Sequence, residues 1–206
     1  MPEQVAFSLP ANSRVVLQVH YHPHDPTPLS DKTEIGIYYA KQTPQQQLFI
    51  LPLINDQFTI PPGDSNYKVT APPNGSFTTP VAVHLWGIYP HMHLLGRKMN
   101  VQAVRPDKTT ACLINIDDWD FNWQGMYRYN NPVPIPPSST LSLAAYYDNS
   151  TDNMRNPNYP PKSVSWGEQT TDEMCIAFIA FTVDGLNASS SDTQRKTSWV
   201  PQWTSR

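Results

Sequence analysis

The sequence predicts an all-β protein, with an antiparallel β-sandwich as the simplest architecture, and three observations lead to this prediction. Short segments of alternating apolar and polar residues recur along the chain, as in strands that bury one face. The chain contains 22 prolines, about twice the usual share, and proline interrupts helices. No window of about 11 residues or more keeps apolar residues at helical spacing without a proline or a glycine.

About nine segments have the alternation of strands, each separated from the next by turn-forming residues. In chain order they are 14–21, 34–39, 48–53, 67–70, 81–88, 99–104, 111–116, 140–147 and 174–182. Three strands are entered through similar turns, at 9–13, 60–64 and 135–139, where proline presets φ and small polar residues bend the chain. Residues 185–206 lack the alternation, and we expect them to form a partly flexible tail.

Charge and composition exclude several classes of protein. Lys and Arg number 14 against 17 Asp and Glu, a net charge of −3, and no run of like charges occurs, which argues against a nucleic-acid-binding or basic membrane-binding surface. No stretch approaches the roughly 18 apolar residues of a membrane span. The first residues have neither the basic start nor the apolar core of a signal peptide, so none is expected in this chain.

The strongest chemical signal is the pair His91 and His93, in the sequence PHMHLLG. Residues i and i+2 of a strand share a face, so both imidazoles point the same way, with Met92 opposite, and both could bind one metal ion. Two histidines alone are a weak site, because this spacing also occurs on an ordinary hydrogen-bonded strand face.

A second cluster, His20, His22 and His24, lies in the sequence VHYHPH. His20 and His22 share the more polar face of the expected strand 14–21, so a solvated strand face and a metal site are both open interpretations. His24 follows a proline in a loop. His84, in VAVHLW, is expected to be an ordinary strand histidine.

An acidic turn delivers Met174 and Cys175 to the start of the last strand, in the sequence DEMC. By themselves, Met174 would fill a gap in the core and Cys175, on the opposite face, would be a small buried apolar residue. Three further carboxylates lie at 117, 118 and 120, interleaved with aromatic residues, which suits a structured loop better than a catalytic acid pair. No nucleophile elbow, phosphate-binding loop or dinucleotide-binding glycine pattern occurs.

Three motifs together resemble the copper type II, ascorbate-dependent monooxygenases, the family of peptidylglycine α-hydroxylating monooxygenase and dopamine β-monooxygenase. They are LQVHY at 17–21, HMHLLG at 91–96 and DEMC at 172–175, and the resemblance spans roughly 14–182. The resemblance implies a jelly-roll β-sandwich that uses copper. It also implies that His91, His93 and Met174 hold the oxygen-binding copper, as catalytic ligands, and that His20 is one of three histidines on a second, electron-delivering copper.

The ligands implied by this resemblance suit the chemistry it implies. Imidazole binds copper in both oxidation states, while a thioether such as that of Met174 favours Cu(I), the state that meets O₂. Two histidines and a weakly held methionine leave a position open for oxygen. The partners implied are a small-molecule substrate, O₂ and an external reductant such as ascorbate, with no nucleic acid.

The chain departs from the family pattern in its first part. In the family, an adjacent His-His pair completes the second copper site upstream of LQVHY, and no His-His occurs here. We therefore expect residues 1–43 to be the last strands of an otherwise missing N-terminal copper domain, which could be separate or removed, and 44–184 to be the C-terminal copper domain. The second site would then be incomplete at His20, unless His22, a weak candidate, and its neighbours complete it.

A second departure concerns the substrate and the cysteines. Peptide-amidating members place an Arg and a Tyr, which hold a substrate carboxylate, where this chain has Tyr89 and Phe178. A peptide carboxylate is therefore not the expected substrate, because its charge would lack a partner. Cys175 is either free or bonded to Cys112. By the same resemblance, so sparse a cysteine set favours a bacterial-type member. Copper supply and the family's oxidising chemistry imply an extracytoplasmic protein, periplasmic or secreted.

Two other interpretations compete with the monooxygenase. A non-catalytic module could hold copper at His91, His93 and Met174 for assembly or copper handling, inactive in isolation because the second site is incomplete. Alternatively, the histidines are ordinary polar residues of a structural sandwich, and substitution of His91 or Met174 then alters stability but not metal content.

Overall fold

The computed structural model describes residues 4–17, 19, 21 and 30–186. These form strands, turns and loops, and the described part of the chain contains no helix, so the all-β prediction is confirmed. It likewise has no helix that could span a membrane. The histidines at 20, 22 and 24 and the expected tail from 187 onward lie outside the described residues.

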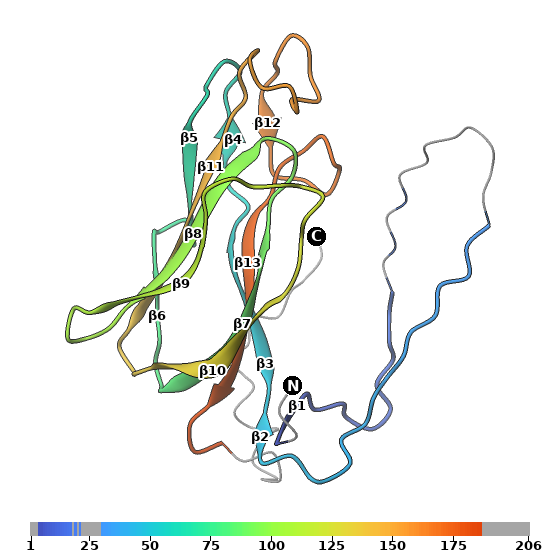
Figure 1. Cartoon of the computed structure of the whole chain (residues 1–206), viewed down its shortest axis with the longest axis vertical. Helices are drawn as coiled ribbons and strands as arrows, with labels where there is room; N and C mark the ends of the chain where they lie inside the picture. The colour runs from blue at the N-terminus through green and yellow to red at the C-terminus, as the bar shows by residue number, and fades with distance from the viewer. Residues whose placement is uncertain (1–3, 18, 20, 22–29, 187–206) are drawn as a thin grey trace.

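Two antiparallel sheets face each other and make up the sandwich (Figure 1). The four-stranded sheet has the order β10 (Tyr127–Ile135), β7 (Val83–His91), β13 (Cys175–Val183), β3 (Phe49–Asn55). The five-stranded sheet has the order β5 (Tyr67–Ala71), β11 (Thr140–Tyr147), β8 (Gly96–Val104), β9 (Thr110–Ile116), with β6 (Phe77–Thr78) paired to β11. Two small pairs complete the fold: β12 (Val164–Ser165) with β4 (Thr59–Ile60), and β1 (Val5–Ala6) parallel to β2 (Gln46–Gln47).

The core lies between the two sheets and is built by alternation. In β11 every second residue is buried, from Leu141 to Tyr147, and in β8 Met99 and Val101 are fully buried. The opposing sheet contributes Leu85 and Ile179 to the same cluster. Because side chains alternate across a strand, this pattern fixes which residues of β7 and β13 face outward.

Seven of the nine expected strands are present as β3, β5, β7, β8, β9, β11 and β13, with ends shifted by a few residues. The strands expected over 14–21 and 34–39 are wrong for the residues described there, which are not in strand conformation. These residues belong to a long arm that projects away from the sandwich (Figure 1); the name arm is used here for the described residues 7–17, 19, 21 and 30–40. Its side chains are largely exposed, for example Val16 at 88% and Tyr38 at 97%. Alternation gives a strand only where a neighbouring strand accepts its backbone hydrogen bonds.

Strand β10 was not expected from the sequence, because Pro132 and Pro134 interrupt its pattern. It forms the edge of its sheet, where proline is tolerated, and its pairing with β7 shifts register between Arg128 and Val133. At the close approach of the two strands, a Cβ on Gly87 would lie 2.8 Å from the backbone oxygen of Tyr127, so glycine is required there.

Candidate metal centre

The two histidines of the H-x-H motif lie where β7 ends. His91 is its last residue, and His93 belongs to the turn that leads into β8. Met92, between them, is fully buried on the opposite side, as expected. The two imidazole rings stand at 85° to each other, with centroids 5.1 Å apart.

The register between β7 and β13 carries Met174 to the same place. His91 pairs with Ile176, and Tyr89 with Phe178. Continuing this register by two residues sets Met174 opposite His93, on the outward face of the sheet. Met174 is half-buried, and its carbonyl oxygen accepts a 2.8 Å hydrogen bond from the Tyr147 hydroxyl.

Hydrogen bonds determine the tautomer of both histidines. The Nδ1 atom of His91 lies 2.5 Å from Oε1 of Gln124, whose amide nitrogen donates to the carbonyl oxygen of Phe121 at 2.7 Å. The Nδ1 atom of His93 lies 3.0 Å from the carbonyl oxygen of Asp172. Both neighbours are acceptors, so each Nδ1 carries the proton, and each Nε2 has the lone pair that a metal needs.

The electrostatics of the pair favour neutral imidazoles. Burial lowers the pKa of His91 below its usual value, the hydrogen bond to Gln124 partly raises it again, and the charge of His93 lowers it further. A metal ion binds the neutral form of histidine, so these effects reduce the competition from protons.

The candidate donor set at this end of the sheet is two imidazoles and a thioether. Among the described residues, no group of three or more His, Cys, Asp and Glu side chains could hold a metal ion. Among the described residues, Met174 is the candidate for a third protein ligand of a metal at His91 and His93. Such a set suits copper, and Cu(I) in particular, far better than magnesium or calcium.

Glu173 is a part of the site that sequence reasoning missed. Its side chain is fully buried, and its carboxylate accepts hydrogen bonds from the backbone N–H groups of His93 at 2.8 Å, Leu95 at 2.6 Å and Met174 at 3.2 Å. Burial raises the pKa of Glu173 to about 8, and these backbone donors, with that of Gly96, lower it in part. The acidic DEMC motif was the available signal, but it does not reveal that this carboxylate turns inward.

The loop after β9 closes over the two histidines, which supports its interpretation as a structured loop. Trp119 is buried, and its indole N–H donates to the carbonyl oxygen of His93 at 3.2 Å. The Phe121 ring meets the His93 ring edge-on at 6.1 Å. Asp120 caps the loop by accepting the backbone N–H of Asn122 at 2.9 Å. No sequence signal distinguished Gln124 of this loop as the partner of His91.

Tyr89 and Phe178 extend the site along the outward face of the sheet. Their rings stack with centroids 6.1 Å apart, and the Tyr89 ring stacks on that of His91 at 6.4 Å. Both side chains are half-buried. An aromatic row therefore runs from the candidate ligands along two adjacent strands.

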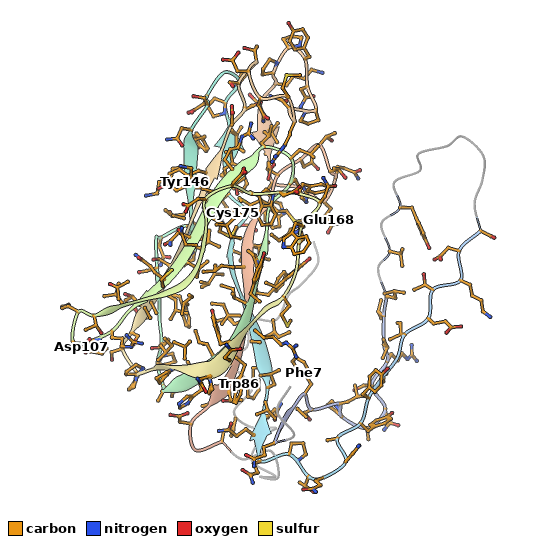
Figure 2. All side chains as sticks on the ribbon, viewed as in Figure 1. Phe7, Trp86, Asp107, Tyr146, Glu168 and Cys175 are labelled. Atoms are coloured by element: carbon orange, nitrogen blue, oxygen red, sulfur yellow. The ribbon has the colours of Figure 1, made fainter. Side chains whose placement is uncertain are left out.

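The remaining candidates do not join this site. His84 lies elsewhere on β7, with its Nδ1 atom 2.7 Å from the carboxylate of Asp184, and is an ordinary strand histidine as expected. Cys112 and Cys175 are both free, which settles the open question of a bond between them. Cys175 lies inside the sandwich (Figure 2), where burial raises the pKa of its thiol to about 12. His20 and His22 lie outside the described residues.

Comparison with known proteins gives one family and several curated relatives. The family described as copper type II ascorbate-dependent monooxygenase, C-terminal domain, matches residues 46–199. The human DBH-like monooxygenase protein 1 is 24% identical over 183 residues, which cover 81% of this chain and 28% of that protein. Dopamine beta-hydroxylase of Canis lupus familiaris is 23% identical over 193 residues, covering 87% and 29%.

The chain thus spans under a third of the length of these two relatives. Among solved structures, that of the infectious bursal disease virus Gt strain matches 80% of this chain and 38% of its own, with a TM-score of 0.35 and 11% identity. A similarity this low informs neither fold nor function.

Proposed function

Since the chain belongs to the copper type II ascorbate-dependent monooxygenase family, as the match over residues 46–199 shows, we propose that it carries an oxygen-reactive copper and supports hydroxylation of a C–H bond. O₂ would supply one oxygen atom to the product and one to water. An external reductant such as ascorbate would supply the two electrons.

The convergence of His91, His93 and Met174 carries this proposal. Both histidines present Nε2, because their Nδ1 atoms face carbonyl acceptors. Met174, just before β13, would add a soft thioether, and the register of β7 and β13, continued by two residues, supports this. Copper bound by this set would supply the one-electron chemistry that O₂ activation requires. The protein's part is to hold neutral ligands in place and to keep a coordination position open.

The aromatic row favours an uncharged, apolar substrate. Tyr89 and Phe178 lie beside the ligands, and neither carries a positive charge that could pair with a carboxylate. A carboxylate set against these two rings would lose hydration without gaining an ionic partner from them. A small aromatic or aliphatic molecule instead gains contact with their faces.

The arrangement of the whole protein follows from the same proposal. Residues 44–184 would form the copper domain, 1–43 the last strands of a preceding copper domain, and 185–206 a tail. His20, with His22 as a weaker candidate, would belong to a second, electron-delivering copper. The need for copper and for an external reductant favours an extracytoplasmic location, periplasmic or secreted.

A second candidate is a copper-binding module without catalysis of its own. It is favoured by one observation: the sequence contains no adjacent His-His pair that would complete a second copper site. In that case the chain would bind Cu(I) but would consume no O₂ with ascorbate and substrate.

Metal analysis of the wild type and of Met174→Ile tests the proposal. After anaerobic loading with Cu(I) and removal of loosely held metal, we expect one copper per chain in the wild type and a loss in the variant. The fold should persist, because the two side chains have similar volumes. Equal losses of Cu(I) and Cu(II) affinity would argue against Met174 as a ligand, and an absence of copper in the wild type would sink the proposal.

Oxygen uptake then separates the two candidates. The full-length protein, given copper, ascorbate and a panel of benzylic and aliphatic substrates, should consume O₂ in proportion to hydroxylated product. Copper binding without substrate-dependent uptake would leave the binding module as the better account.

A further inference from the structure

Glu173 lies between the two segments that supply the candidate copper ligands. One segment is the turn at 92–95, which carries His93, and the other is the segment just before β13, which carries Met174. The two are about 80 residues apart in sequence, yet a single carboxylate accepts backbone N–H groups from both. Its Oε2 atom bonds His93 and Met174, and its Oε1 atom bonds Leu95.

The backbone of Glu173 is fixed independently of these contacts. Its N–H donates to the carbonyl oxygen of Ser165 at 3.1 Å, and its own carbonyl oxygen accepts the N–H of Gly167 at 3.2 Å. The side chain therefore extends inward from an anchored position. The hydrogen bonds given above for this carboxylate all come from backbone N–H groups of the ligand-bearing segments.

We propose that Glu173 is a positioning residue that sets the spacing between His93 and Met174, and that it holds the copper site in its binding geometry before copper arrives. This inference rests on the proposed function, because it takes His93 and Met174 to be ligands. It goes further by naming the group that couples the histidine side of the site to the methionine side.

The chemistry of the contacts explains why a glutamate is needed. The backbone N–H groups of His93, Leu95 and Met174 point at its two oxygens, and both oxygens accept when the carboxyl is ionised. A glutamine keeps the shape but turns an NH₂ group toward one set of donors, so at least one buried N–H loses its acceptor. An aspartate is one methylene shorter and cannot reach both segments at hydrogen-bond distance.

The main test compares Glu173→Gln with the wild type by Cu(I) and Cu(II) affinity and by X-ray absorption at the copper edge. We expect Cu(I) affinity to fall by about 10- to 100-fold, as for other groups that orient metal ligands. Cu(II) affinity should fall less, because the thioether contributes little to it. The copper–sulfur signal of the Cu(I) form should weaken or vanish.

Two control variants separate positioning from general loss of stability. Thr79→Val removes a buried hydroxyl that bridges Pro136 and Ser139, away from the ligands. It should lower stability without altering the copper–sulfur signal. Trp119→Phe removes the donor to the His93 carbonyl and so affects the histidine side alone. It too should keep the copper–sulfur signal. A Glu173→Gln protein with the wild-type signal and an unchanged ratio of Cu(I) to Cu(II) affinity would overturn the proposal.

Hydrogen exchange of the metal-free wild type tests the same proposal without any variant. The amides of His93, Leu95 and Met174 should exchange as slowly as those of the β7–β13 ladder, because the carboxylate protects all three. Exchange of the Met174 amide at the rate of an unstructured peptide would overturn the proposal even if Glu173→Gln fails to fold. If wild-type copper shows no sulfur ligand while these amides are protected, the proposed copper site fails and the structural contact stands.

Discussion

The ligand end of the sandwich, residues 91–96, 119–124 and 172–176, differs from the described residues of the arm in what its side chains contact. At the ligand end, three segments far apart in sequence meet through buried hydrogen bonds, centred on Glu173 and Trp119. The arm has the same alternation of apolar residues as the sandwich strands, but its side chains are largely exposed, including Val16 and Tyr38. Tertiary contacts, rather than alternation, therefore distinguish the two regions.

The comparison predicts that stability depends on the buried tryptophan of the ligand-end loop. Trp119 is 2% exposed and belongs to the core cluster, whereas Trp123, four residues later, is 74% exposed. We expect Trp119→Ala to reduce the free energy of unfolding by about 3–5 kcal/mol. Trp123→Ala should change it by no more than about 0.5 kcal/mol. Urea unfolding measures both, and equal effects would show that the loop does not pack as described.

A smaller change next to Trp119, at Gly96, should also reduce the stability of the protein. A Cβ added to Gly96 would lie 2.9 Å from the Cβ of Met92 and 3.0 Å from Cδ1 of Trp119. Gly96→Ala should therefore cost about 1–3 kcal/mol, as other overpacking substitutions do, and weaken copper binding through the displaced Trp119.

Gly125→Ala, just after the loop that carries Trp119, is the matched control, since an added Cβ there meets nothing within 4 Å. Thermal unfolding of the two variants distinguishes them. A Gly96→Ala protein as stable as the wild type would mean that the turn has more room than its contacts indicate.

The hydrogen bond between Gln124 and His91 should matter for metal affinity more than for stability. Gln124→Leu removes the acceptor of the Nδ1 proton, and we expect metal affinity to fall by about tenfold, with under about 1 kcal/mol lost from stability. Gln124→Glu keeps an acceptor and should retain the affinity or raise it. Competition titration with Cu(II) provides the measurement, and a Leu variant with wild-type affinity would show that Gln124 does not orient the ring.

The sequence predicted those features that a local pattern or a short motif can carry. Alternation located seven strands, and the H-x-H spacing correctly set Met92 opposite His91. The carboxylate of Glu173 and the amide of Gln124 could not be found in this way, because their partners lie about 80 and 33 residues away in sequence. Their roles exist only once β7, β13 and the loop after β9 have come together.

The predictions of two strands in the arm were wrong for a related reason. A strand forms only where a neighbouring strand pairs with it. Residues 14–21 and 34–39 satisfy the local rule, yet no described strand is paired with the residues that the structure describes there. One contact across the arm, from the Tyr21 hydroxyl to the carboxylate of Asp31 at 2.6 Å, is exposed. Alternation thus indicates a propensity for the β conformation, and whether a strand forms depends on the segments around it.

The smallest expected effect is a substitution in the arm, and a matched pair of valines makes it informative. Val101 is fully buried in β8, while Val16 in the arm is 88% exposed. Replacing either by threonine keeps the shape and exchanges one methyl group for a hydroxyl. At Val101 this hydroxyl enters the core and should cost about 1–3 kcal/mol. At Val16 it meets water, so the free energy of unfolding should stay within about 0.5 kcal/mol of the wild type. A loss of unfolding free energy at Val16 comparable to that at Val101 would show that the arm packs against a surface in solution. Its alternation would then correspond to a buried face.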